Sequence, residues 1–140
     1  EQHQKVLEVL EFLEILELKD KKVHQMSTGQ LRRCIIGRAL IHDPKAFILD
    51  EPTVGLDIKS QHSFIKLIQK LSKSASIIIV THHIEEIFEE ITHVALIHNK
   101  TIFKQGKKEE ILTSKNLSEI FEIDIDLQKE NERYYIKSIK

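Results

Sequence analysis

The sequence predicts an α/β fold in which a mostly parallel sheet is flanked by helices. Two short apolar runs, at 46–49 and 76–80, have the length and the β-branched content of buried strands. The run at 46–49 suits a strand that is buried on both faces. The segment between them, 58–71, carries apolar residues at helical spacing. A strand, a helix and a second strand in this order indicate a parallel βαβ unit.

Two helices are expected ahead of the first strand. Apolar residues recur at helical spacing over 5–18, and acidic residues occupy the other face. Ser27 lies three residues before Gln30, which is the spacing of a capping box, so a second helix should begin there. That helix should end by Asp43, because Pro44 disfavours a helical conformation in the residue before it.

Shorter elements are expected after the βαβ unit. They are a helix at 84–91, a strand at 94–97, a turn at 99–100 that leads into a strand at 101–105, short helices near 109–112 and 117–121, and a final strand at 134–139.

The composition is that of a soluble globular protein, with 41% hydrophobic and 31% charged residues among 140. The net charge is -1 and the lysines are spread along the chain, so nucleic acid is not an expected partner. No apolar stretch approaches the roughly 20 residues that span a bilayer, so any link to a membrane must come through a partner. The single Cys34 cannot form an internal disulfide, which fits a reducing cytosol. Because the chain begins at Glu1 in a segment that is already helix-like, an N-terminal portion is expected to have been removed.

Two acidic residues, Asp50 and Glu51, follow the first predicted strand directly. The carboxyl ends of strands are where ligands bind in open α/β sheets. One carboxylate could hold Mg²⁺ through an oxygen, and the other could orient or deprotonate a water for attack on a γ-phosphate. The alternative is a solvated strand end without a catalytic role.

A turn of small residues, Met26–Gln30, leads into the second predicted helix. Backbone N–H groups and the helix dipole favour an anion at a helix N-terminus. Gly29 would permit a close approach of the backbone to that anion. The alternative is an ordinary helix cap.

His82 follows the second predicted strand, at the same expected sheet edge as the two acids. Its imidazole could donate a hydrogen bond to a phosphate oxygen, or its position could be incidental. Asp57, in the turn Gly55–Asp57, is expected to cap the helix at 58–71.

Taken together and in this order, these segments resemble the second half of the nucleotide-binding domain of the ABC ATPases, which have the P-loop NTPase fold. The resemblance covers the chain up to about Ile111. It assigns Met26–Gln30 to the signature motif, 46–51 to the Walker B strand, Gly55–Asp57 to the D-loop and 81–82 to the switch-histidine segment. Met26 replaces the usual leucine and Thr28 stands where glycine is common, and neither change removes the backbone donors.

The resemblance also implies a division of the chain. Residues 1–43 would form a portion of the helical subdomain with the signature motif, 44–113 the C-terminal half of the ATPase core, and 114–140 a C-terminal tail. The Walker A half is missing, because no Gly-x-x-x-x-Gly-Lys string followed by Ser or Thr occurs. The chain alone is therefore expected to be inactive.

The cofactors that the resemblance implies are ATP and Mg²⁺. By the same resemblance, Glu51 would be the general base, His82 would contact the γ-phosphate and Asp50 would bind Mg²⁺. Asp57 would lie near the seam of a head-to-tail dimer of two such domains. The nucleotide held by the opposing domain would contact the signature residues Ser27, Thr28, Gly29 and Gln30.

The function implied is that of the energy-coupling ATPase of a membrane transporter, held at the inner face of the cell membrane by permease subunits. The segment at 81–87 is similar to that of ABC ATPases of molybdate or iron uptake, which points to a bacterial importer of a small anion or metal compound. Two alternatives remain open. One is a soluble ABC ATPase that acts on ribosomes or DNA, and the other is a domain without enzymatic activity.

Overall fold

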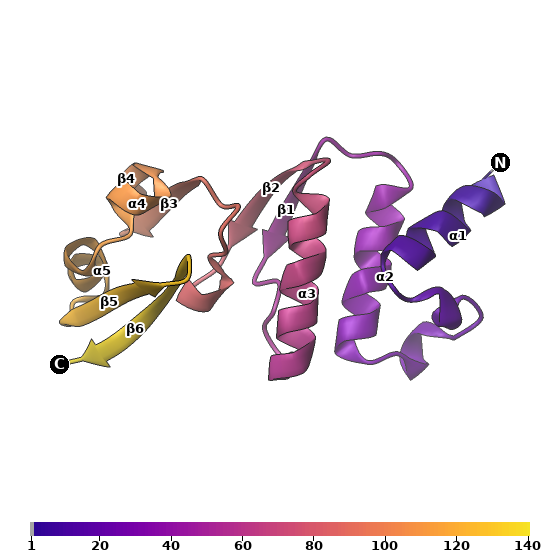
Figure 1. Cartoon of the computed structure of the whole chain (residues 1–140), viewed down its shortest axis with the longest axis horizontal. Helices are drawn as coiled ribbons and strands as arrows, with labels where there is room; N and C mark the ends of the chain where they lie inside the picture. Colours follow the sequence, from indigo (N-terminus) through magenta and orange to yellow (C-terminus); the bar gives the residue numbers. More distant parts are fainter. Residues whose placement is uncertain (1) are drawn as a thin grey trace. The chain divides into compact units, whose positions relative to one another are not determined.

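The computed structural model describes residues 2–140 and divides into two compact units, Glu1–Val80 and Thr81–Lys140. Figure 1 draws the first unit in indigo to magenta and the second mainly in orange to yellow. None of the helices in residues 2–140 has the length and hydropathy needed to cross a bilayer.

The first unit combines helices with one parallel pair of strands. Its elements are α1 (Gln2–Phe12), η1 (Leu16–Leu18), η2 (Val23–Gln25), α2 (Thr28–Leu40), β1 (Ala46–Asp50), α3 (Ile58–Leu71) and β2 (Ser76–Val80). In the parallel register, Ala46 lies opposite Ser76 and Asp50 lies opposite Val80. Both strands therefore end at the same edge, and the predicted βαβ unit is confirmed (Figure 1).

Helix α1 is shorter than predicted, because the chain leaves the helical conformation at Glu14, whose φ is 58°. The prediction of one helix over 5–18 is therefore wrong in its second half. Burial departs from the helical spacing at this break: Leu13 and Ile15 are buried, with 0% and 2% exposure, whereas Leu16, which would continue the predicted apolar face, is 40% exposed. The left-handed residue Glu14 thus brings Ile15 into the core, where a continuous helix would have placed Leu16.

Helix α2 begins as predicted, with a capping box. The Ser27 hydroxyl oxygen accepts from the Gln30 backbone N–H at 3.2 Å, and the Gln30 side-chain oxygen accepts from the Ser27 N–H at 3.0 Å. The helix ends at Leu40, ahead of Pro44, as the sequence predicts.

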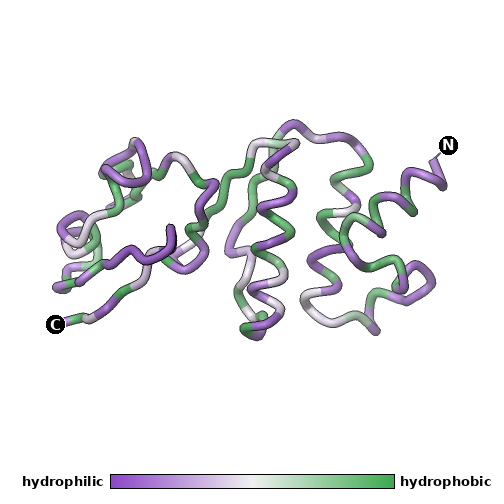
Figure 2. The backbone as a smooth tube through the Cα atoms, viewed as in Figure 1, coloured by the Kyte–Doolittle hydropathy of each residue, from purple (hydrophilic) through white to green (hydrophobic). Residues whose placement is uncertain are grey.

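The parallel sheet is covered on one face only within the first unit. Phe47 is 7% exposed and pairs with Ile77 on the covered face. On the opposite face Ile48, Ile78 and Val80 are 72%, 52% and 48% exposed. The prediction that 46–49 is buried on both faces is thus wrong for this unit, although Figure 2 shows hydrophobic residues along both strands. An unbroken apolar run is typical of a strand that is covered on both faces. Within this unit, the crossover helix covers one face.

Helix α3 has the predicted bounds. Asp57 is its N-cap and accepts from the Ser60 backbone N–H at 2.9 Å. The helix buries one apolar face, formed by Phe64, Leu67, Ile68 and Leu71. This face follows the i, i+3, i+4, i+7 spacing that predicted the helix.

The second unit contains two antiparallel hairpins and short helices. Its elements are η3 (Ile84–Glu86), β3 (His93–His98), β4 (Thr101–Lys107), α4 (Lys108–Ile111), α5 (Ser114–Phe121), β5 (Ile125–Glu130) and β6 (Arg133–Ile139). The predicted turn between β3 and β4 is confirmed, with Asn99 and Lys100 at φ 49° and 63°. Two successive positive φ values are typical of the tight turns that join hairpin strands.

The core of the second unit is formed by residues that come after the predicted motifs in the chain. It contains Leu96, Ile111, Leu112, Leu117, Ile125 and Tyr134. Ile84 of η3 and Ile87, which follows it, pack against this core, and η3 replaces the helix predicted over 84–91. The prediction of a helix over 84–91 is therefore wrong. A 3-10 turn has about three residues per turn, so residues three apart, such as Ile84 and Ile87, reach the same side without a longer helix.

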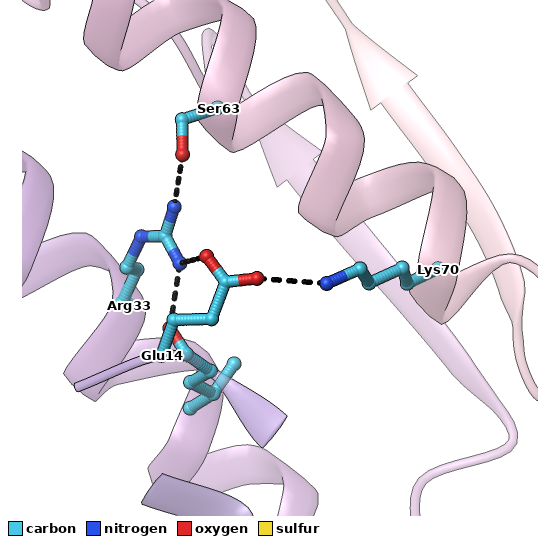
Figure 3. A network of polar contacts seen from close by, with 5 residues as sticks. Glu14, Arg33, Ser63 and Lys70 are labelled. Atoms are coloured by element: carbon cyan, nitrogen blue, oxygen red, sulfur yellow. Dashed lines mark hydrogen bonds and ion pairs between the residues drawn. The ribbon is translucent and has the colours of Figure 1, made fainter. Parts of the chain in front are cut away.

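A polar network joins three segments of the first unit (Figure 3). Arg33 of α2 donates to the Leu13 carbonyl oxygen at 2.6 Å and to the Ser63 hydroxyl of α3 at 2.5 Å. Its Nη1 also lies 3.5 Å from Glu14 Oε2, and Lys70 of α3 donates to Glu14 Oε1 at 2.8 Å. The left-handed residue after α1 is therefore held by side chains from both α2 and α3.

Helices α1 and α2 approach closely at Gly37, and we expect Gly37→Ala to destabilise the chain. A Cβ at this position would lie 2.8 Å from Leu13 Cδ1, and Leu13 is fully buried. The cost of overpacking, about 1–3 kcal/mol, exceeds the gain of about 1 kcal/mol in helix propensity, so we expect a net loss of about 1 kcal/mol. Chemical denaturation measures it. Gly29→Ala in the same helix is the control, since its Cβ would meet no atom closer than 3.7 Å; an equal loss in both variants would contradict the packing argument.

Removing the Glu14 charge should weaken the chain in a pH-dependent way. The hydrogen bond from Lys70 and the charge of Lys70 hold the pKa of Glu14 below its ordinary value. The ionised form therefore stabilises the fold above the ordinary carboxyl pKa, and this contribution is lost as the pH falls through the lowered value. Because the Glu14 side chain is 58% exposed, solvent screens the pair, and we expect Glu14→Gln to lose about 0.5 kcal/mol at neutral pH.

Denaturation at neutral pH and well below pH ~4 measures this effect. The difference between the parent chain and Glu14→Gln should shrink toward zero in acid. Glu17→Gln, at an exposed residue of η1, is the control. A Glu14→Gln loss of the same size at both pH values would show that the charge is not the cause.

Candidate functional site

The candidate site is built on the edge where β1 and β2 end. Asp50 is the last residue of β1 and its side chain is exposed. Glu51 follows it, and its N–H donates to the Val80 carbonyl oxygen at 2.8 Å, so the ladder between the strands extends one residue further. The carboxyl edge of the parallel pair therefore carries both predicted acids.

Glu51 has a left-handed backbone conformation, with φ 45°. This conformation costs about 1–2 kcal/mol for a residue that has a Cβ. Residues in such conformations cluster at active sites, where the surrounding structure holds them. The strand thus ends abruptly at Glu51, and the side chain is no longer directed by the alternation of the strand.

Arg32 of α2 holds the loop that follows Glu51. One guanidinium nitrogen donates to the Pro52 carbonyl oxygen and lies 3.4 Å from the Glu51 carbonyl oxygen, and the other donates to the Val54 carbonyl oxygen. The side chain of Pro52 is buried in this loop. The helix that carries the signature-like turn is therefore bonded directly to the acidic loop.

The signature-like turn lies at the start of α2. The backbone N–H groups of Thr28 and Gly29 belong to the first helical turn, whose donors have no acceptor within the helix. The Ser27 oxygen accepts a bond within the capping box, which leaves its hydroxyl hydrogen able to donate elsewhere. Ser27 and Thr28 are exposed, so this turn can present donors to an anion outside the unit.

The turn before α3 lies beside the turn before α2. A Cβ built on Gly29 would lie 3.7 Å from Leu56 Cδ2 and 4.0 Å from the Ser60 Cβ. Gly55 has φ 78°, which a residue with a side chain rarely adopts, and nothing lies within 4 Å of the position of its Cβ. The N-termini of α2 and α3 therefore lie side by side, and Thr28, Gly55 and Asp57 in them are exposed.

Asp57 has the capping role that its position predicts. Its carboxylate accepts from the Ser60 N–H at 2.9 Å and from the Ser60 hydroxyl at 2.8 Å. The bond from the Ser60 backbone N–H, followed by that from its hydroxyl, holds the pKa of Asp57 below its ordinary value. The carboxylate stays ionised, and it fixes the direction in which the preceding turn enters the helix.

His82 belongs to the second unit, in the segment between β2 and η3. Its ring centroid lies 4.1 Å from that of His83, with the ring planes inclined at 36°. The His83 backbone N–H donates to the Thr81 hydroxyl at 2.9 Å, which shapes the chain just after β2. A role for His82 beside Glu51 stays a prediction from the sequence.

Within the first unit, the structure brings together the signature-like turn, the Gly55–Asp57 turn and the loop of Glu51. The sequence reasoning missed Arg32, the residue that bonds two of these segments. Its signals in the sequence were its place one turn into a helix that begins at a candidate anion site and its place just after the signature-like turn, and no role was predicted from either. The exposed carboxylate of Asp50 supplies the hard oxygen that Mg²⁺ prefers, so the donor chemistry at this edge fits that ion.

Known proteins resemble the chain in sequence. A family model described as “ABC transporter” matches residues 1–54. A putative ABC transporter ATP-binding protein of Streptococcus mutans is 32% identical over 116 residues, which are 80% of this chain and 45% of that protein. The energy-coupling factor transporter ATP-binding protein EcfA2 of Bacillus cereus is 35% identical over 105 residues, which are 74% of this chain and 35% of that protein. The chain spans less than half of the length of these relatives.

Solved structures resemble it as well. One, described as an inward-facing conformation of a putative metal-chelate type ABC transporter, matches with a TM-score of 0.83 and 25% identity, over 98% of this chain and 55% of that one. Another is cbiO1 of Clostridium perfringens, described as part of the ABC transporter complex cbiONQ, with a TM-score of 0.72 and 33% identity, over 84% of this chain and 47% of that one. Because the first match covers 98% of the chain, the likeness extends beyond Ile111 into the C-terminal segment.

Proposed function

Because the chain belongs to the ABC transporter ATP-binding domains, which have the P-loop NTPase fold, we propose that it forms the catalytic-base half of an ATP-hydrolysing subunit. The observation that carries the proposal is Glu51, held in a left-handed conformation at the carboxyl edge of β1 and β2. The phosphate-binding loop would come from residues or a chain outside this sequence, in which no such loop occurs.

The two acids would have different roles at this edge. Asp50 would hold Mg²⁺ through a carboxylate oxygen, and the ion would neutralise charge on the phosphates of ATP. Glu51 would accept a proton from the attacking water, which it can do only when its carboxylate is directed toward that water. His82 would donate a hydrogen bond to a γ-phosphate oxygen. The abrupt end of β1 at Glu51 supports different directions for the two carboxylates.

The turns before α2 and α3 would face a second nucleotide-binding domain in a head-to-tail dimer. Their exposure supports this role, as do the helix N-terminal donors of Thr28 and Gly29 and the hydroxyl of Ser27. Gln30 would contact the same nucleotide, and Asp57 would lie at the seam. Donors supplied by a partner stabilise the transferring charge only once the two domains close and exclude water.

Coupling to transport is the function that the relatives favour. EcfA2 is named as part of an energy-coupling factor transporter, and cbiO1 as part of a transporter complex. We therefore place the proposed subunit at the inner face of a cell membrane, bound to permease subunits. A bacterial importer of a metal compound or a small anion fits the likeness to a metal-chelate type transporter. Co-purification with a permease tests this, and association with ribosomes or DNA instead would favour a non-transport ATPase.

The 140-residue chain alone should show no specific hydrolysis of Mg-ATP. The reason is that its sequence contains no Gly-x-x-x-x-Gly-Lys segment followed by Ser or Thr, the motif that cradles the phosphates. Phosphate release from the purified chain measures this, with the Glu51→Gln chain as a control for contaminating ATPases. Turnover that disappears in Glu51→Gln would contradict the expectation.

In the whole subunit, Glu51→Gln should bind ATP and hydrolyse it at least about a hundredfold more slowly, which is the size of a typical general-base contribution. Nucleotide binding and single-turnover hydrolysis should be measured separately. Glu11→Gln, an exposed residue of α1, is the matched control and should hydrolyse at the parent rate. An unchanged rate in Glu51→Gln would overturn the role of Glu51 as the base.

A further inference from the structure

We infer that Arg32 is a positioning residue, which holds the loop at 51–54 so that Glu51 keeps the backbone conformation that directs its carboxylate. The inference rests on the proposed function, because it concerns the base of that reaction. It adds a residue outside the acids and the turns already assigned, and it makes α2 part of the machinery that sets the direction of Glu51.

The guanidinium group of Arg32 donates to carbonyl groups of one loop. Nη1 donates to the Pro52 carbonyl oxygen and lies 3.4 Å from that of Glu51, and Nη2 donates to the Val54 carbonyl oxygen. A guanidinium is planar and presents its N–H groups in a fixed fork. Two of its nitrogens can therefore hold the Pro52 and Val54 carbonyl groups in a fixed relative direction, whereas the three donors of an ammonium rotate.

Glu51 is held on both sides of its Cα. On the amino side, its N–H donates to the Val80 carbonyl oxygen at 2.8 Å. On the carboxyl side, its carbonyl oxygen accepts from the Val54 N–H at 3.3 Å and lies 3.4 Å from Arg32. A change of φ from 45° to a negative value would rotate the next peptide away from these donors. Arg32 therefore opposes relaxation of a conformation that is unfavourable for glutamate.

The position of Arg32 in the chain gives this arrangement a second consequence. Arg32 lies in the same helix as Gly29, little more than one turn after the N-cap Ser27. The turn proposed to contact the opposing nucleotide and the loop that carries the base are thus connected by one rigid segment and one side chain. A displacement of the N-terminus of α2 would move the carbonyl groups on which the direction of Glu51 depends.

The first test measures the loop itself, in the 140-residue chain. In Arg32→Ala, amide exchange at Val54 and Leu56 should accelerate about tenfold, as expected when a charged hydrogen bond that closes the loop is lost. These amides bond to the Glu51 and Thr53 carbonyl oxygens at 3.3 and 3.1 Å. The control is Arg38→Ala, which removes an arginine from an exposed position of α2. It should leave the exchange rates of both amides unchanged. Unchanged exchange in Arg32→Ala would overturn the inference.

The second test measures turnover in the whole subunit. Arg32→Ala should lower kcat about tenfold or more with KM for ATP nearly constant, since a displaced catalytic group can cost up to about a hundredfold. Arg32→Lys keeps the charge without the fork, so its kcat should stay close to that of Arg32→Ala. Full rescue by lysine, or an unchanged kcat in Arg32→Ala, would overturn the inference. If Arg32→Ala does not fold, Arg32→Lys alone decides, by the same two measurements.

Failure of the proposed function is recognised separately. Glu51→Gln measured in the same assay reports whether Glu51 is the base, whereas amide exchange reports whether Arg32 holds the loop. A normal rate in Glu51→Gln together with faster exchange in Arg32→Ala would reject Glu51 as the base, and the positioning role with it, while the structural contact stands. A slow Glu51→Gln with normal exchange in Arg32→Ala would reject the role of Arg32 alone.

Discussion

The position of α2 is the constraint on which the first unit depends. Gly37 brings its backbone against Leu13, Arg33 bonds it to the end of α1 and to α3, and Arg32 bonds it to the loop after β1. Arg33 and Gly37, four residues apart, lie on the same face of α2 and both meet Leu13, whereas Arg32 points to the loop from a neighbouring face. Because hydrogen bonds from a charged group are stronger than neutral ones, the two arginines fix polar segments that apolar packing could not hold in register. The turn that begins α2 is therefore presented from a helix that has little freedom to shift.

The chemistry proposed for the chain follows from where parallel strands end. Two strands joined by a helix bring their carboxyl ends to a common edge, and the residues after those ends need not continue the alternation of the sheet. Glu51 leaves that alternation at once, through a left-handed backbone conformation, while Asp50 still belongs to the strand. Adjacent carboxylates can then serve different atoms of one substrate, which a regular strand end would not allow.

Much of this arrangement could be predicted from the sequence, because the signals were local. The capping box of Ser27 and Gln30, the cap at Asp57 and the bounds of α3 each depend on residues within one turn of one another. The break at Glu14 could not be predicted, since the side chains that hold it come from α2 and α3. The role of Arg32 could not be predicted for the same reason. Its acceptors lie about 20 residues away in the sequence, and they are backbone carbonyl oxygens, which every residue type has. The exposure of Ile48 could not be predicted, because an apolar run does not show which elements cover the strand.

Helix α3 behaves as a rod whose two ends are engaged by different parts of the first unit. Its 14 residues extend about 21 Å, from the turn fixed by Asp57 to Lys70, which meets Glu14. The helix has no proline or glycine, the residues at which helices usually kink. Because Arg33 also holds Ser63 between those ends, α3 is braced at its start, its middle and its last turn, and the turn before Asp57 inherits a fixed orientation from this brace.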